Sequence, residues 1–132
     1  MVRGQSNLKK ETLTLTVEGL IPKTGILRAA LFQSSDGFPE ETKKAFSITR
    51  ATVTVASETM TFENIPFGSY AISVYQDLNN DQRLNKSFLG IPKEPIGFSN
   101  DPPLRMSPPH FEDAVFHFND PLNKIIIHMR TR

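Results

Sequence analysis

The sequence contains no cysteine and no tryptophan, and it has no apolar run long enough to cross a bilayer. The lack of cysteine excludes disulfides, thiolate metal sites and cysteine nucleophiles. Fifteen Lys and Arg nearly balance fourteen Asp and Glu, which gives a formal net charge of +1. A chain so close to neutral has no electrostatic reason to bind nucleic acid or an anionic membrane, so we expect neither as a partner.

Alternating apolar and polar residues predict short β-strands over most of the chain. The alternation is clear in three stretches: "TLTLTVEG" at 12–19, "GSYAISVY" at 68–75 and "DAVFHF" at 113–118; "NKIIIHMR" at 123–130 is predicted to be the last strand. The stretch "GILRAALFQ" at 25–33 is apolar on both faces, which is typical of a central strand. About seven short strands, turns rich in Gly and Pro, and little helix predict an all-β fold, an antiparallel β-sandwich.

No repeat or linker divides the 132 residues, so residues 12–132 are predicted to form a single domain. Residues 1–11 are polar, lack the apolar core of a signal peptide, and are predicted to be a disordered N-terminal segment. Residues 77–110 carry six of the ten prolines and almost no alternation. This long Pro-rich loop is too apolar for disorder, so we expect it to fold back over one edge or end of the sandwich.

The stretch "DLNNDQRLN" at 77–85 has the spacing of a cation-binding loop. Calcium takes six to eight oxygen ligands, and a short loop supplies them when every second residue points inward. The predicted calcium ligands are the side chains of Asp77, Asn79, Asp81 and Asn85 and the backbone carbonyl of Arg83. The candidates to complete the shell are Glu94, Asp101, Glu112 and water.

The loop is not an EF-hand, because Gln82 stands at its sixth position instead of Gly and Phe88 at its twelfth instead of Glu. Only two carboxylates supply charge, so calcium affinity is expected to be weak, on the order of 10⁻⁴ M. A second interpretation stays open. Asp and Asn are common in plain polar turns, because their side chains accept hydrogen bonds from nearby backbone amides.

The residues from "YQDLNNDQRLN" through "GIPKEPIGFSN" to "PPHFEDAVF" resemble a bacterial family, domain-of-unknown-function family 2141. The resemblance covers nearly the whole chain after about residue 12. The matching residues are Gly68, Tyr70, Ala71, Asp77, Asn79, Leu84, Gly90, Ile91, Pro92, Glu94, Gly97, Phe98, Ser99, Asn100, Pro109, Phe111, Asp113 and Ala114. The chain departs from the pattern at Gln76, where a His is usual, and at Asp81 and Asn85, which exchange Asn and Asp but keep the charge of the loop.

The resemblance implies a transthyretin-like or immunoglobulin-like sandwich in an exported protein, periplasmic or secreted, whose signal peptide is absent from this sequence. It implies no activity. We therefore expect a non-enzymatic binding or structural module, monomeric, whose partner is an unknown peptide, glycan or protein and whose cofactor is calcium if the 77–85 loop binds it.

Two alternatives from other functional classes are kept. The first is a small hydrolase or a peptidase-associated accessory domain that uses His110, which could converge with Glu112 but not with Asp113 if the segment is a strand. No catalytic motif supports it, and His117 and His128 are expected to face solvent. The second is a peptide- or glycan-binding module that uses the apolar 88–98 loop around Phe88 and Phe98.

Overall fold

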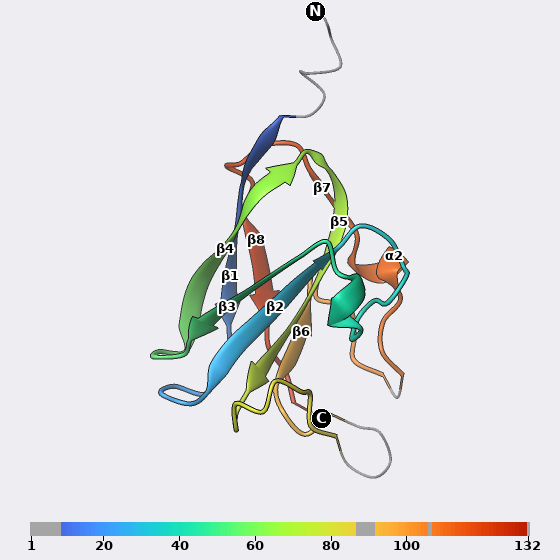
Figure 1. The fold of residues 1–132 in the computed structure, drawn as a ribbon. Helices are drawn as coiled ribbons and strands as arrows, with labels where there is room; N and C mark the ends of the chain where they lie inside the picture. Colours follow the sequence, from blue (N-terminus) through green and yellow to red (C-terminus); the bar gives the residue numbers. More distant parts are fainter. Residues whose placement is uncertain (1–8, 87–91, 106, 132) are drawn as a thin grey trace, which may run out of the picture.

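The computed structural model describes residues 9–86, 92–105 and 107–131, and they form two β-sheets packed face to face (Figure 1). The three-stranded sheet has the order β4 (Ser57–Pro66), β1 (Lys10–Glu18), β8 (Ile125–His128). The five-stranded sheet has the order β3 (Ser47–Thr52), β2 (Ile26–Phe32), β5 (Gly68–Asp77), β6 (Ile96–Phe98), and β7 (Phe116–Phe118) also pairs with β5. The predicted β-sandwich is confirmed, with eight strands in the described part of the chain.

The main core lies between the two sheets and is built by the predicted alternation. On β1, Leu13, Leu15 and Val17 are buried while the threonines between them are only partly covered. The strand β5 buries its own alternate residues, Tyr70 and Ile72, in the same core. Each strand thus turns one apolar face inward, which stabilises the sandwich by removing that face from water.

The central position predicted for residues 25–33 is confirmed, because β2 pairs antiparallel with β3 on one side and with β5 on the other. Two details differ from the predicted pattern. The strand β1 begins at Lys10, two residues before the predicted domain boundary, and residues 1–8 lie outside the described residues. The last strand, β8, runs parallel to β1, so one pairing of the sandwich is not antiparallel.

The helical content of the described residues is small. It consists of a single turn of 3-10 helix, η1 (Thr42–Lys44), and the four-residue helix α2 (Phe111–Ala114). No helix in the described ranges is long and apolar enough to cross a membrane.

The described parts of the Pro-rich segment, residues 77–86, 92–105 and 107–110, fold back over the outer face of the five-stranded sheet. Its strand β6, which the sequence pattern does not show, pairs with β5. Phe98 is buried there with Ile96 and Ala114 in a second apolar cluster. Gly97 lies within β6 without a positive φ, and a Cβ there would come within 2.6 Å of Cγ2 of Ile127, so the glycine leaves room for that side chain.

The edge of the three-stranded sheet is joined to this segment through His128, which lies on β8 and is exposed as expected. Its Nδ1 is 2.6 Å from the carboxylate of Asp101, and its Nε2 is 3.4 Å from that of Glu18. The hydrogen bond with Asp101, and then the negative charge of Asp101, raise the pKa of His128 above its usual 6.5.

The protein is therefore expected to lose stability as the pH rises through the folded-state pKa of His128. A raised pKa means that the folded state binds the proton more tightly, so this contribution is complete below about pH 6.5 and disappears above the raised value. Urea unfolding at about pH 5.5 and about pH 9 measures the difference. His128→Gln should remove this pH-dependent component and His117→Gln should retain it; equal pH dependence in both variants would refute the assignment.

Candidate functional site

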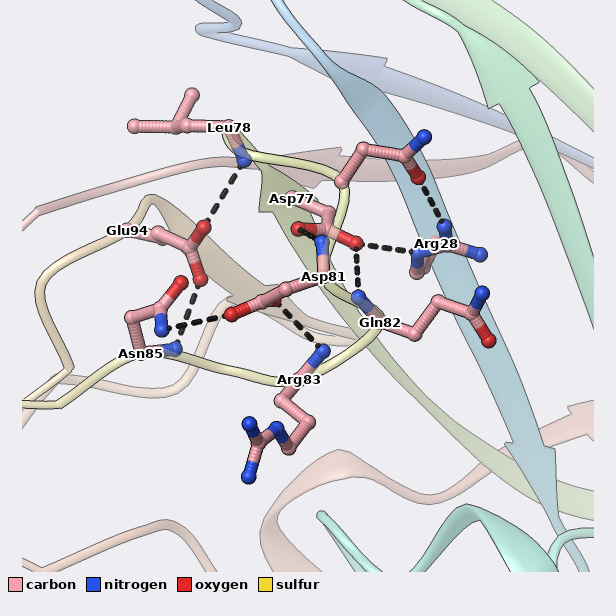
Figure 2. Close-up of polar contacts among 9 residues, drawn as sticks. Arg28, Asp77, Leu78, Asp81, Gln82, Arg83, Asn85 and Glu94 are labelled. Carbon is pink, nitrogen blue, oxygen red and sulfur yellow. Dashed lines mark hydrogen bonds and ion pairs between the residues drawn. The ribbon is translucent and has the colours of Figure 1, made fainter.

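The 77–85 loop begins at Asp77, the last residue of β5, whose side chain is fully buried. Its carboxylate accepts a hydrogen bond of 2.7 Å from Nε of Arg28 on the neighbouring strand β2. It also accepts the backbone N–H groups of Asp81 and Gln82, at 3.1 and 2.8 Å (Figure 2). This one carboxylate therefore closes the turn on itself and ties it to the sheet.

A second carboxylate holds the two ends of the same loop. Glu94 is only 3% exposed. Its Oε2 accepts the backbone N–H of Leu78 at 2.9 Å, and its Oε1 accepts that of Asn85 at 2.8 Å (Figure 2). A buried carboxylate needs such donors to offset its lost hydration. Glu94 thus holds the two ends of the loop together through hydrogen bonds, the role that a bound cation would otherwise have.

Asp81 organises the middle of the loop. Its carboxylate accepts the side-chain amide of Asn85 and the backbone N–H of Arg83, each at 3.0 Å. The bond from Asn85, followed by that from Arg83, lowers the pKa of Asp81. The side chain of Arg83 points away from Asp77 and Glu94 (Figure 2). Asn79 is exposed, and its neighbour Asn80 instead accepts Nη2 of Arg28 at 2.7 Å.

The structure thus brings four of the five residues predicted to bind calcium into one network of hydrogen bonds from N–H donors: Asp77, Asp81, Asn85 and, through its backbone N–H, Arg83. Among the described residues, no group of three or more His, Asp or Glu side chains is arranged to hold a metal ion. The guanidinium of Arg28 already neutralises the charge of Asp77, so a cation there would compete with it for this carboxylate. Calcium binding stays a prediction.

Gln76, where the family pattern has a His, has a structural contact that sequence reasoning missed. Its side chain is fully buried. The carbonyl Oε1 accepts the N–H of Ile21 at 2.9 Å, and Nε2 donates to the carbonyls of Ile21 and Thr24 at 2.8 Å each. Gln76 thus holds the turn between β1 and β2. The departure from the usual His was the only sequence signal at this position.

His110 is not on a strand, which corrects the geometry assumed for it. It is the residue before α2, and its backbone N–H donates to the carboxylate of Asp113 at 3.0 Å. Asp113 was expected to face away from His110, but its carboxylate contacts the backbone N–H of His110. Three residues along a helical turn lie close together, whereas neighbours along a strand alternate faces.

A groove of about 840 Å³ opens on the outer face of the five-stranded sheet. Residues of β3, β2, β5 and β6 line it, together with loop residues from 39–42, 82–86 and 104–109. The residues of the predicted 88–98 site that contribute are Pro92, Ile96 and Phe98, while residues 87–91 lie outside the described residues. Arg28 and Ala30 are alternate residues of β2, so they share the face of the strand that points away from the core. This spacing was the feature of the sequence that indicated the outer face.

The groove combines an apolar lining with a strong excess of positive charge. Its cationic residues are Arg28, Arg50, Arg83, Lys86 and Arg105. Among the described residues, Glu40 is the one acidic residue that lines it, and its carboxylate lies 2.5 Å from Nζ of Lys86. Burial, and then the charge of Asp77, raise the pKa of the lining Tyr75 to about 12, so its phenol is neutral at ordinary pH.

Comparison with protein families identifies one match. The model of a family described as "Uncharacterized protein conserved in bacteria (DUF2141)" matches residues 15–126. Neither the curated proteins nor the solved structures gave a significant match.

Proposed function

The chain belongs to the DUF2141 family, and we propose that it is a non-enzymatic binding module whose ligand site is the groove on the outer face of the five-stranded sheet. The observation that carries this proposal is the groove itself, with an apolar lining and charged residues around it. A volume of about 840 Å³ lies within the usual range for ligand sites, about 300–1,000 Å³.

The loops around the groove are tied to each other and to the sheet by contacts within the protein, which favours binding. The ion pair of Glu40 and Lys86 joins two of the lining loops. Oγ of Ser73 donates to the carbonyl of Pro39 at 2.7 Å, which attaches the first of these loops to β5. A preformed site loses less conformational entropy on binding than one that must be ordered by its ligand.

An extended peptide fits the dimensions of this site. The lining includes residues of four neighbouring strands, β3, β2, β5 and β6, which lie about 4.8 Å apart, so the groove spans about 14 Å. An extended chain rises about 3.3 Å per residue, so about four residues cross the sheet. The exported location that the family resemblance implies is part of the proposal, and fractionation of cells that express the full protein tests it.

The exposed side chain of Ile48 is expected to contribute directly to peptide binding. It lies on the edge strand β3, lines the groove and is 66% exposed, so a bound peptide would cover it. We would select binders from a phage-displayed library of random dodecapeptides and measure their affinity as synthetic peptides by fluorescence anisotropy. Ile48→Ser should weaken binding by about tenfold, because burial of an isoleucine side chain contributes about 1.5–3 kcal/mol.

The matched control is Ile126→Ser. Ile126 is also on a strand and 43% exposed, but it lies on β8 in the other sheet and is not part of the groove. It should leave peptide affinity unchanged. The proposal fails if the library yields no binder, or if the two substitutions weaken binding equally, because the groove would then not be the contact surface.

A further inference from the structure

We infer that the ligand of the groove is an acidic peptide segment whose carboxylates are bound by Arg50 and Arg83. This inference rests on the proposed function and specifies its ligand. Three features support it: the positive charge of the groove, the two arginine side chains without a hydrogen bond or ion pair among the described residues, and their positions on separate elements of the lining.

The groove concentrates positive charge that the rest of the chain does not have. Five cationic residues line it against one acidic residue, whereas the formal net charge of the whole chain is only +1. Charge of one sign in a concave site focuses the electrostatic field and raises the local concentration of ligands of the opposite sign. Such complementarity selects acidic partners and disfavours basic ones.

Two of these cations are available for a ligand. Arg28 is already paired with Asp77, and Lys86 with Glu40. By contrast, within the described ranges the side chains of Arg50 and Arg83 form no hydrogen bond or ion pair, and both are exposed. An arginine offers a planar fork of N–H donors that matches a carboxylate in a bidentate geometry.

The positions of the two arginines favour a ligand with more than one carboxylate. Arg50 lies on β3, and Arg83 lies in the 77–85 loop that follows β5, so the two arginines belong to separate elements of the lining. In an extended peptide, side chains on one face recur about every 7 Å. Acidic side chains at alternate positions share one face of the peptide, so they can point into the groove together, toward the two guanidinium groups. An amphiphile with a single charged head could pair with only one.

The selected dodecapeptides give the first test, since the library is not biased toward any charge. The selected peptides that bind in the groove should be enriched in Asp and Glu at alternate positions. For the best binder, a synthetic version with each Glu and Asp replaced by Gln and Asn should bind about tenfold more weakly, and the affinity of the acidic version should fall as salt is raised.

Charge reversal gives the sharper test. The double variant Arg50→Glu/Arg83→Glu should lose about tenfold or more in affinity for the acidic peptide and should prefer a version of that peptide with Lys at the acidic positions. The control is Lys23→Glu/Lys124→Glu, which changes the net charge of the protein by the same amount at two exposed residues outside the groove. It should retain the preference for the acidic peptide.

The outcomes separate the two proposals. Peptides that bind in the groove, lose affinity with Ile48→Ser and show no enrichment in acidic residues would support the proposed function and overturn the acidic ligand. If the control double variant also loses the preference for acidic peptides, the effect comes from the net charge of the protein. This result would overturn the roles of Arg50 and Arg83. If no peptide binds the groove, both proposals fail.

Discussion

Replacing Asp77 by alanine is expected to lower the free energy of unfolding by about 3–5 kcal/mol. The carboxylate is fully buried, and it accepts the guanidinium of Arg28 and two backbone N–H groups of the loop. Its removal leaves Arg28, whose side chain is only 17% exposed, without its partner and leaves the two amides unsatisfied. Urea unfolding followed by circular dichroism measures the loss.

The matched control is Asp81→Ala, in the same loop. Asp81 is partly exposed, and its carboxylate accepts the backbone N–H of Arg83 and the side-chain amide of Asn85. Its loss should cost about 1 kcal/mol or less, because water can replace these partners. Equal losses at Asp77 and Asp81 would contradict the claim that the ion pair with Arg28 holds the loop.

The same variants also decide between the two interpretations of the loop. Calcium that binds only the folded state must raise the free energy of unfolding, by about 1.4 kcal/mol when the free calcium concentration is ten times the Kd. A rise in Tm that occurs with calcium but not with magnesium, and that Asp77→Ala abolishes, would make the loop a cation site. If the Tm is the same in EDTA and in calcium, the loop is a polar turn that the carboxylates of Asp77 and Glu94 hold closed.

Gly25→Ala is expected to lower the free energy of unfolding by about 2–5 kcal/mol. Gly25 has a φ of +65°, where an L-residue costs about 1–2 kcal/mol. A Cβ at this position would also lie 2.1 Å from the backbone oxygen of Asp77 and 2.9 Å from Cα of Leu78. Because backbone atoms cannot rotate away as a side chain can, the turn or the start of the 77–85 loop would have to move, at a further cost of about 1–3 kcal/mol. Thermal and urea unfolding measure the effect.

Gly68→Ala provides the comparison. Gly68 lies at the start of β5 without a positive φ, and the nearest atom to an added Cβ is 3.6 Å away, an ordinary van der Waals contact. This substitution should change the free energy of unfolding by less than about 1 kcal/mol. Similar stability of the two variants would show that the backbone of Asp77 can shift without loss.

The sequence by itself determined the elements that depend on local pattern. Alternation places Leu13, Leu15 and Val17 on one face of a strand, because successive side chains of a strand point to opposite faces. The apolar run from Ile26 marks β2 as a central strand. The polar string at 77–85 was identified as a loop built around Asp77 and Asp81, because Asp and Asn side chains bind nearby backbone amides.

Only the tertiary structure decided what these elements meet. Arg28 and Asp77 are separated by 49 positions, and Leu78 and Glu94 by 16. No local pattern could therefore show that Arg28 pairs with Asp77, or that Glu94, a candidate cation ligand, accepts backbone amides of the loop instead. The groove arises in the same way. Alternation puts Arg50 on the outer face of its strand, but only the packing of distant loops around that face makes it part of a concave, positively charged site. Periodicity along a chain fixes which side chains share a face, whereas contacts between distant segments depend on how the whole chain folds.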